Sequence, residues 1–191
     1  MNADDIRRLA ADSIALKQRF FTASAPQLIE VGGRMAESLN AGGRVLAFGN
    51  GGSAADAQHF VAELVGRLAR ERRGLSAIAL GSDPSVVTAV SNDMGFVAVF
   101  RRQVEAHGRK GDVALGISTS GRSPNVIEAL RSARARGLVT VGLTGEGGGE
   151  LAGLVDHLIA VPHPDTQRVQ EVHTMVLHVL AQVIEEAADR S

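Results

Sequence analysis

Apolar residues in the first forty positions recur at steps of three and four, which is the spacing of one helix face. One face carries Ile6, Leu9, Ala10, Ser13, Leu16 and Phe20, and a second carries Leu28, Val31, Met35 and Leu39. Ser24 is a typical N-cap and Pro26 suits a first helical turn. The pattern therefore predicts two helices within residues 1–41, the second ending at Gly42 and Gly43.

From residue 44 onward, short continuous apolar runs alternate with longer helical stretches. The runs at 45–48, 75–80, 113–117, 138–143 and 157–161 predict strands. Strands that are apolar on both faces and alternate with helices are typical of a parallel α/β sheet. We expect one α/β domain over 1–191, a three-layer, Rossmann-like sandwich of about five parallel strands flanked by helices. Residues 1–41 form its helical extension, and residues 44–191 form the core and the C-terminal helix.

Composition narrows the classes of function. The 191 residues carry a net charge of −1 and no cysteine, and aromatic residues make up 3%. Charge balance and few aromatics argue against nucleic acid as a partner. The apolar stretch at 172–184 is too short to span a membrane, so we expect no membrane partner and a cytoplasmic location. The arginines at 67, 70, 72 and 73 are interpreted as a solvated helix end.

Four hydroxyl side chains follow the third predicted strand and precede a helix that Pro124 helps to start. They are Ser118, Thr119, Ser120 and Ser123. The carboxyl ends of parallel strands are where ligands bind, and a helix N-terminus attracts anions. No lysine occupies a P-loop position, so a sugar phosphate suits the segment better than a nucleoside triphosphate. The plainer interpretation is a helix cap.

A second glycine-rich turn follows the first predicted strand. Its residues Asn50, Gly51, Gly52 and Ser53 would let a ligand approach the backbone closely. The spacing is not that of a dinucleotide fingerprint, so the turn alone is a modest signal. Segments 91–93 and 144–149 are expected at the same edge of the sheet.

Two pairs of side chains have the types that bind metals or move protons. His59 and Glu63 lie four residues apart on one helix face, and Gln170 and His178 lie on the last helix. An isolated His–Glu pair is more often a surface hydrogen bond, and His178 could equally be a buried core histidine. Gln170 and His178 are about 12 Å apart in helix rise, so ligands from a neighbouring subunit are an alternative.

These segments occur together in an order that resembles the phosphoheptose isomerases of the sugar isomerase (SIS) domain superfamily. The resemblance rests on GNGGSAADAQHFVAE at 49–63, SND at 91–93, STSGRSPN at 118–125, and QEVH at 170–173 with His178. It runs from about Val45 to the last helix and includes the helical N-terminus. Several motifs in the right order are far more specific than any one glycine loop.

The resemblance implies an enzyme that converts sedoheptulose 7-phosphate into D-glycero-D-manno-heptose 7-phosphate, the first step toward activated heptose. It implies a homotetramer with active sites at subunit interfaces and one zinc ion per subunit. Glu63 and His178 would be the acid/base pair, and zinc would be held by His59, Glu63, Gln170 and His178. The substrate would contact Asn50, Gly51, Gly52, Ser53, Glu63, Asn92, Asp93, Ser118, Thr119, Ser120, Ser123 and Gln170.

Other functions fit the same superfamily. One branch is non-catalytic and binds the bacterial replication initiator, but that branch lacks the Glu and the final His that this sequence has as Glu63 and His178. An isomerase of another sugar phosphate is a further alternative, because no motif encodes the length or stereochemistry of the sugar. One tension concerns Glu63, which cannot be a tight zinc ligand and a free base at once.

Overall fold

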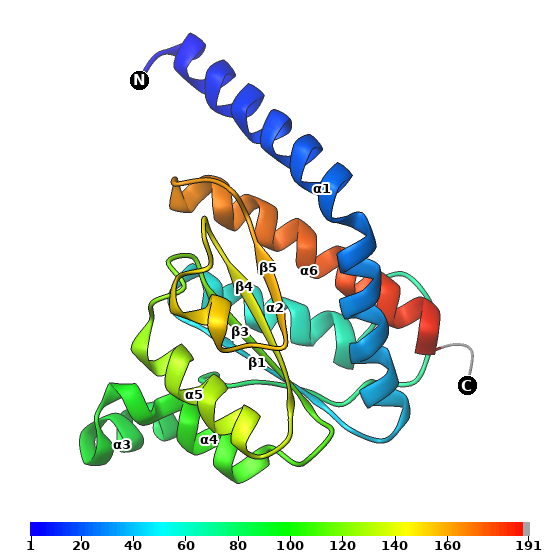
Figure 1. The fold of residues 1–191 in the computed structure, drawn as a ribbon, viewed down its shortest axis with the longest axis vertical. Coiled ribbons are helices and arrows are strands. Elements are labelled where there is room, and N and C mark those ends of the chain that lie inside the picture. Colours follow the sequence, from blue (N-terminus) through cyan, green and yellow to red (C-terminus); the bar gives the residue numbers. More distant parts are fainter. Residues whose placement is uncertain (189–191) are drawn as a thin grey trace.

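A computed structural model of the chain describes residues 1–188. Within them the strands form one five-stranded sheet, which lies at the centre of the molecule (Figure 1). All neighbouring strands pair in parallel, in the order β2-β1-β3-β4-β5. The strands are β1 (Val45–Gly49), β2 (Ala77–Ala79), β3 (Val113–Ser118), β4 (Val139–Thr144) and β5 (His157–Ala160). The parallel sheet expected from the alternating pattern is confirmed.

The central strands form because their residues are apolar or small and can be buried on both faces. Every residue of β1 and β3 is buried, and β4 is buried from its second residue onward. From β1 the chain continues to β2 on one side, and β3 then returns to the other side of β1. β1 and β3 pair along their length, from Val45↔Val113 to Gly49↔Ile117. In open parallel sheets, such a switch point leaves a crevice at the carboxyl ends of the two strands.

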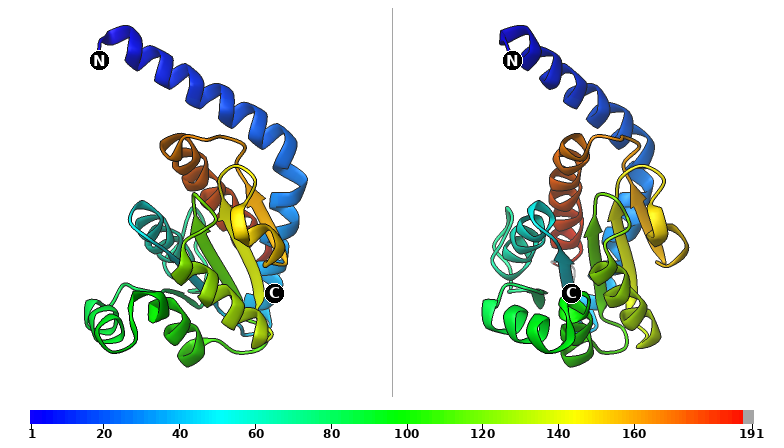
Figure 2. Two further views of the ribbon diagram at one scale, coloured as in Figure 1. Left: turned by 60° about the vertical axis from the view of Figure 1, so that its left-hand side comes forward. Right: turned by 90° about the vertical axis from the view of Figure 1, so that its left-hand side faces the viewer.

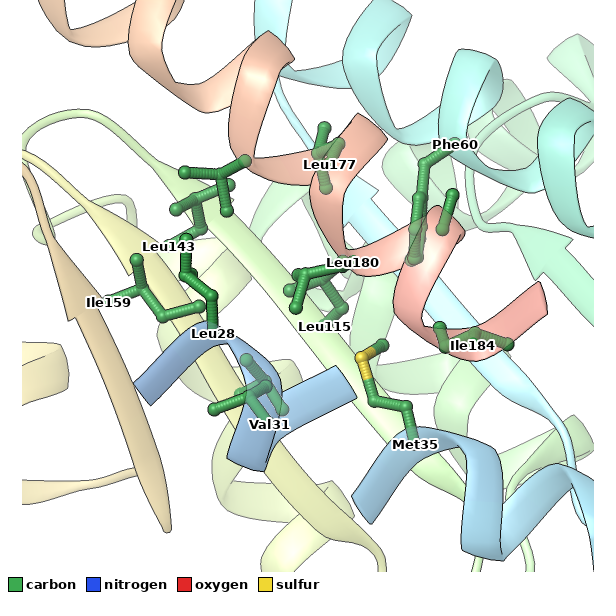
Figure 3. Close-up of a cluster of buried hydrophobic side chains, with 14 of the residues drawn as sticks. Leu28, Val31, Met35, Phe60, Leu115, Leu143, Ile159, Leu177, Leu180 and Ile184 are labelled. Atoms are coloured by element: carbon green, nitrogen blue, oxygen red, sulfur yellow. The ribbon is translucent and has the colours of Figure 1, made fainter. Parts of the chain in front are cut away.

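Helices cover both faces of the sheet and make the three layers that the sequence predicts (Figure 2). One face carries α1 (Ala3–Asn40), α2 (Gly52–Val65) and α6 (Thr166–Ala188), and the other carries α4 (Val99–His107) and α5 (Pro124–Ala135). The remaining helical segments are α3 (Pro84–Met94), η1 (Phe96–Ala98) and η2 (Gly149–Gly153). Figure 3 shows the larger core, in which Met35, Leu115 and Leu180 join α1, β3 and α6.

The prediction of two N-terminal helices is wrong, because α1 is one helix of 38 residues with Pro26 inside it. Ser24 does not cap a second helix. A proline removes one backbone donor and usually bends a helix rather than ending it when packing holds both sides. The helix changes direction near its middle, and its first half projects beyond the sheet (Figure 1).

The helix after the glycine turn is also shorter than expected, since α2 ends at Val65 instead of near residue 70. The arginines therefore lie on a loop, and Arg72 is not solvated. Its guanidinium Nε lies 3.2 Å from Glu185 Oε1, and both side chains are buried. Within residues 1–188, no helix is long and apolar enough to cross a membrane.

Candidate functional site

The hydroxyl-rich segment lies where β3 ends, at the N-terminus of α5. We call residues 118–123 the serine loop. Ser118 Oγ lies 2.9 Å from Ser123 Oγ and 3.5 Å from Ser120 Oγ, so three hydroxyls converge. Ser123 is the N-cap residue of α5, but its side chain does not cap the helix and bonds to Ser118 instead. Hydroxyls gathered at a helix N-terminus form an environment that suits a phosphate group.

The loop at 144–149 supports the serine loop from the neighbouring strand. Gly145 N donates to Thr119 O at 3.0 Å, and Glu150 N donates to Gly121 O at 3.0 Å. Gly121 has φ +62°, and a Cβ atom at this position would lie 2.1 Å from Gly148 O. Only glycine fits this approach of two backbones. Segment 144–149 therefore lies at the same edge of the sheet as the serine loop, as expected.

The glycine turn after β1 faces the serine loop across the switch point. The side chains of Asn50 and Asn125 exchange two amide hydrogen bonds of 2.9 Å, which join the end of β1 to the first turn of α5. Gly51 has φ +55°, a conformation that favours glycine. Ser53 is buried in the first turn of α2. Asn50 to Ser53 therefore share one edge of the sheet with the serine loop.

Polar side chains of α2 and α6 face one another along an open cleft, the α2–α6 cleft. Its volume is about 270 Å³, and it is lined by Gly52, Asp56, Gln167, Gln170, Glu171 and Thr174. A Cβ atom on Gly52 would lie 2.7 Å from Gln170 Nε2, so the Gln170 amide lies close against the Gly52 backbone. One turn on, Thr174 Oγ1 donates to Asp56 Oδ1 at 3.0 Å.

The next contact between the same helices brings His59 and His178 together. Their ring centroids are 4.9 Å apart in an edge-to-face arrangement, and His59 Nε2 lies 3.0 Å from Glu63 Oε1. One ligand atom from each of His59, Glu63 and His178 lies within 4.8 Å of the others. Two imidazoles and one carboxylate are the donors of many catalytic zinc sites, so this arrangement could hold a divalent metal.

Gln170, Asn92 and Asp93 are predicted site residues that belong neither to this group nor to the two loops described above. The amide of Gln170 contacts Gly52 at the other end of the cleft, about 10 Å of helix rise from His59. Asn92 and Asp93 are exposed in the last turns of α3, where Asn92 Nδ2 donates to Asp93 Oδ1 at 2.8 Å. They were expected at the carboxyl edge of the sheet, and the structure places them at the C-terminal end of α3, which begins at Pro84.

Sequence reasoning missed Asp56, Thr174 and Asn125 as parts of the site. Burial raises the pKa of the Asp56 carboxyl, while the hydrogen bond from Thr174 and the neighbouring histidines His59 and His178 act in the opposite direction. A signal for Asp56 existed, because it precedes His59 by three residues on the same helix face. No comparable signal pairs it with Thr174, which is distant in sequence.

The buried histidine of α6 is His173, whereas His178 is only half-buried. The ring of His173 is fully enclosed, and its Nε2 lies 3.0 Å from Thr144 O. Burial lowers the pKa of His173 to about 4, although the bond to Thr144 O works against this shift. The core role that the sequence left open for His178 therefore belongs to His173.

Comparison with known proteins gives consistent results. The SIS domain family model matches residues 10–145. The chain is 52% identical over 173 residues to the phosphoheptose isomerase of Roseiflexus sp. (strain RS-1), which covers 91% of this chain and 88% of the relative. The phosphoheptose isomerase of Aquifex aeolicus is 48% identical over 183 residues, 96% of each chain. The structure of the Neisseria gonorrhoeae phosphoheptose isomerase superposes with a TM-score of 0.91 at 43% identity, covering 96% of this chain and 98% of that one.

Proposed function

This chain belongs to the phosphoheptose isomerases of the SIS domain family, and we propose that Glu63 and His178 are its acid/base pair. The chain is an aldose–ketose isomerase that converts sedoheptulose 7-phosphate into D-glycero-D-manno-heptose 7-phosphate. The observation that carries the residue assignment is the meeting of His59, Glu63 and His178 between α2 and α6. The product is the first intermediate toward activated heptose.

The chemistry needs one group that handles a carbon-bound proton and one that handles oxygen-bound protons. Glu63 would take the proton from C1 of the ketose and return it to C2, through an enediol. His178 would supply a proton to the C2 oxygen and accept one from the C1 oxygen. A carboxylate and an imidazole suit these two tasks near neutral pH. Both side chains are only partly buried, so a substrate can reach them.

The phosphate end of the substrate belongs, in this proposal, to the serine loop. Ser118, Thr119, Ser120 and Ser123 would bind the phosphate oxygens beside the N-terminus of α5. The sugar would lie against the neighbouring turn, at Asn50, Gly51, Gly52 and Ser53, and against Gln170. Support comes from the convergence of the Ser118, Ser120 and Ser123 hydroxyls and from the adjacent glycine turn. Asn92 and Asp93 would have to reach the sugar from elsewhere in an assembly or after α3 moves.

We propose that His59, Glu63 and His178 hold one zinc ion. Their ligand atoms need to draw in slightly, because donors around a tetrahedral zinc lie about 3.3 Å apart. A bound zinc would act as a Lewis acid toward the substrate oxygens. Gln170 completes the ligand set predicted from the resemblance, and its distance from the other three favours a Gln170 supplied by a neighbouring subunit. Glu63 would bind weakly enough to act as the base.

The same geometry supports a homotetramer with shared active sites. Glu63 lies eleven residues after Gly52, about 16 Å along the α2 axis. The serine loop lies at the Gly52 end. A seven-carbon sugar phosphate whose phosphate is held there would have to extend along most of α2 to bring its carbonyl end to Glu63 of the same subunit. We propose that a second subunit supplies Glu63 and His178, and that the projecting half of α1, with Ile6 and Ile14 exposed, helps to join the subunits. We retain the cytoplasmic location expected from the sequence.

The test replaces Glu63 by Gln, which keeps the side-chain shape and removes the base. We expect Glu63→Gln to lose turnover by at least about 100-fold, the range of general-base effects. Binding of sedoheptulose 7-phosphate, measured by calorimetry, should stay within a few-fold of wild type. The exposed variant Glu37→Gln is the matched control and should leave both quantities unchanged. Loss of binding together with turnover would contradict the assignment of Glu63 as the base.

The non-catalytic alternative within the superfamily is not favoured. Relatives that cover nearly the whole chain at about half identity are named phosphoheptose isomerase, and the Glu63 and His178 positions are occupied here. Discrimination among sugars of different length would be seen directly by offering shorter phosphorylated ketoses alongside the seven-carbon substrate.

A further inference from the structure

We propose that His173 is a positioning residue for the phosphate: its hydrogen bond to the Thr144 carbonyl, added to the one from Val161 N, orients the peptide on which the serine loop rests. This inference goes beyond the acid/base and metal residues, and it rests on the proposed binding of phosphate by the serine loop. It starts from a buried polar side chain that the reaction itself does not use.

The setting of His173 leaves it one partner. Its side chain has no exposed surface, Nε2 lies 3.0 Å from Thr144 O, and Nδ1 is buried without a hydrogen bond in the described part of the chain. A carbonyl oxygen only accepts, so Nε2 carries the proton and donates it. A buried imidazole with one nitrogen unsatisfied costs more than an apolar side chain of similar size. The hydrogen bond to Thr144 O is what the histidine adds to this position.

The hydrogen bond from His173 is made to the 144–145 peptide, which also contacts the serine loop. The carbonyl of Thr144 and the N–H of Gly145 belong to one planar peptide group. His173 donates to the oxygen of this peptide, which also accepts from Val161 N at 2.9 Å, and the N–H of the same peptide donates to Thr119 O at 3.0 Å. The contact is close, because a Cβ atom on Gly145 would lie 2.4 Å from Thr119 O. The orientation of the 144–145 peptide therefore sets the position of the Thr119 carbonyl.

The 119–120 peptide connects this contact to the hydroxyl groups of the serine loop. The carbonyl of Thr119 and the N–H of Ser120 again share one planar, trans peptide group and point in opposite directions. Fixing the Thr119 carbonyl thus fixes the direction of the Ser120 N–H in the loop where the Ser118, Ser120 and Ser123 hydroxyls converge. Two hydrogen bonds and two rigid peptides connect α6 to the proposed phosphate site.

The experiment compares His173→Gln, which can donate from its amide, with His173→Leu, which packs but cannot donate. The dissociation constants for inorganic phosphate and for sedoheptulose 7-phosphate are measured on the full chain, together with KM, kcat and the zinc dissociation constant. For His173→Leu, we expect both phosphate constants and KM to rise about tenfold, the effect of misdirecting one donor to a charged group. We expect kcat and the zinc constant to stay within about threefold, and His173→Gln to recover most of the loss.

A second variant, Gly145→Ala, changes the same peptide at the serine loop and leaves the side chains of α6 as they are. In Gly145→Ala the new methyl group would press on Thr119 O, so phosphate affinity should fall with His173 still present. Unchanged phosphate affinity in both His173→Leu and Gly145→Ala, or an equal loss in kcat with KM constant, would overturn the proposal.

Different variants test whether the serine loop binds phosphate at all. Ser120→Ala and Ser123→Ala remove loop hydroxyls directly and should weaken phosphate binding whatever His173 does. If these variants bind phosphate as wild type does, the serine loop is not the phosphate site. If they lose binding and His173→Leu does not, only the positioning role of His173 is wrong.

Discussion

Burial shifts the pKa values of two side chains of the site region in opposite directions, and both shifts favour the neutral form. His173 has its pKa lowered to about 4 because its ring has no access to water, and Asp56 has its pKa raised by partial burial in the α2–α6 cleft. A neutral His173 donates one hydrogen bond to Thr144 O and carries no charge into the core. The Asp56 carboxyl lies near His59 and His178 of the proposed metal group, and both histidines act against the rise of its pKa.

The lowered pKa of His173 makes the stability of the fold depend on pH. In the unfolded chain this imidazole takes up a proton near pH 6.5, whereas in the folded chain it does so only near pH 4. Stability is therefore lost as the pH falls through this window, by about 2 kcal/mol between pH 7 and pH 5. Urea unfolding of wild type and His173→Gln at both pH values, at equal protein concentration, measures the difference. Equal pH dependence in the two proteins would contradict it.

At the scale of elements, the end of α2 is held by a buried ion pair on the following loop. Glu185 of α6 accepts the backbone N–H groups of Leu68, Ala69 and Arg70 at 3.0 to 3.1 Å. Arg72 pairs with Glu185 and donates to Glu63 O at 2.7 Å. The backbone that carries the proposed base is thus joined to α6, which carries His178.

Breaking this pair from one side should be costly, because it leaves a buried charge without its counterion. We expect Arg72→Met to lower the free energy of unfolding by about 3–5 kcal/mol. The exposed pair of Arg131 and Glu128 offers a matched control, and Arg131→Met should cost less than about 1 kcal/mol. Chemical denaturation of both variants at one protein concentration provides the comparison. A cost for Arg72→Met no larger than that of the control would show that the pair adds nothing to stability.

The elements that could be predicted from the sequence are those fixed by local pattern. Continuous apolar runs gave the strands, because β1, β3 and β4 are buried on both faces. The helix boundary predicted near Pro26 is wrong, because contacts between α1 and the distant α6 hold one continuous helix together across this residue. The motifs located the serine loop and His59–Glu63. The meeting of His59 with His178 depends on packing between helices more than 100 residues apart, which local pattern does not contain.

At the scale of the whole molecule, the proposed shared active site depends on more than one chain. The serine loop and the Glu63–His178 group lie toward opposite ends of α2, and apolar residues on the projecting half of α1 are exposed. Isologous contacts between copies of one chain can place the loop of one subunit against the acid/base pair of another. In such an arrangement, each active site takes its serine loop and its acid/base pair from different subunits.

Subunits inactivated in different halves of a shared site should restore one another. We expect Ser120→Ala/Ser123→Ala and Glu63→Gln to be inactive alone. Mixed after dissociation and reassembled at equal amounts, they should recover about a quarter of wild-type activity, because that share of sites combines two intact halves. Light scattering establishes that the mixture has reassembled. A reassembled mixture without activity would place each complete site within a single subunit.

Enediol isomerisation of sedoheptulose 7-phosphate can be followed by proton NMR in D2O. The purified protein is mixed with the sugar phosphate, once with added zinc and once with a chelator. We expect new aldose anomeric signals with deuterium entering at C2, and a slower reaction in the chelator arm. A folded protein that leaves the spectrum unchanged in both arms would contradict this expectation.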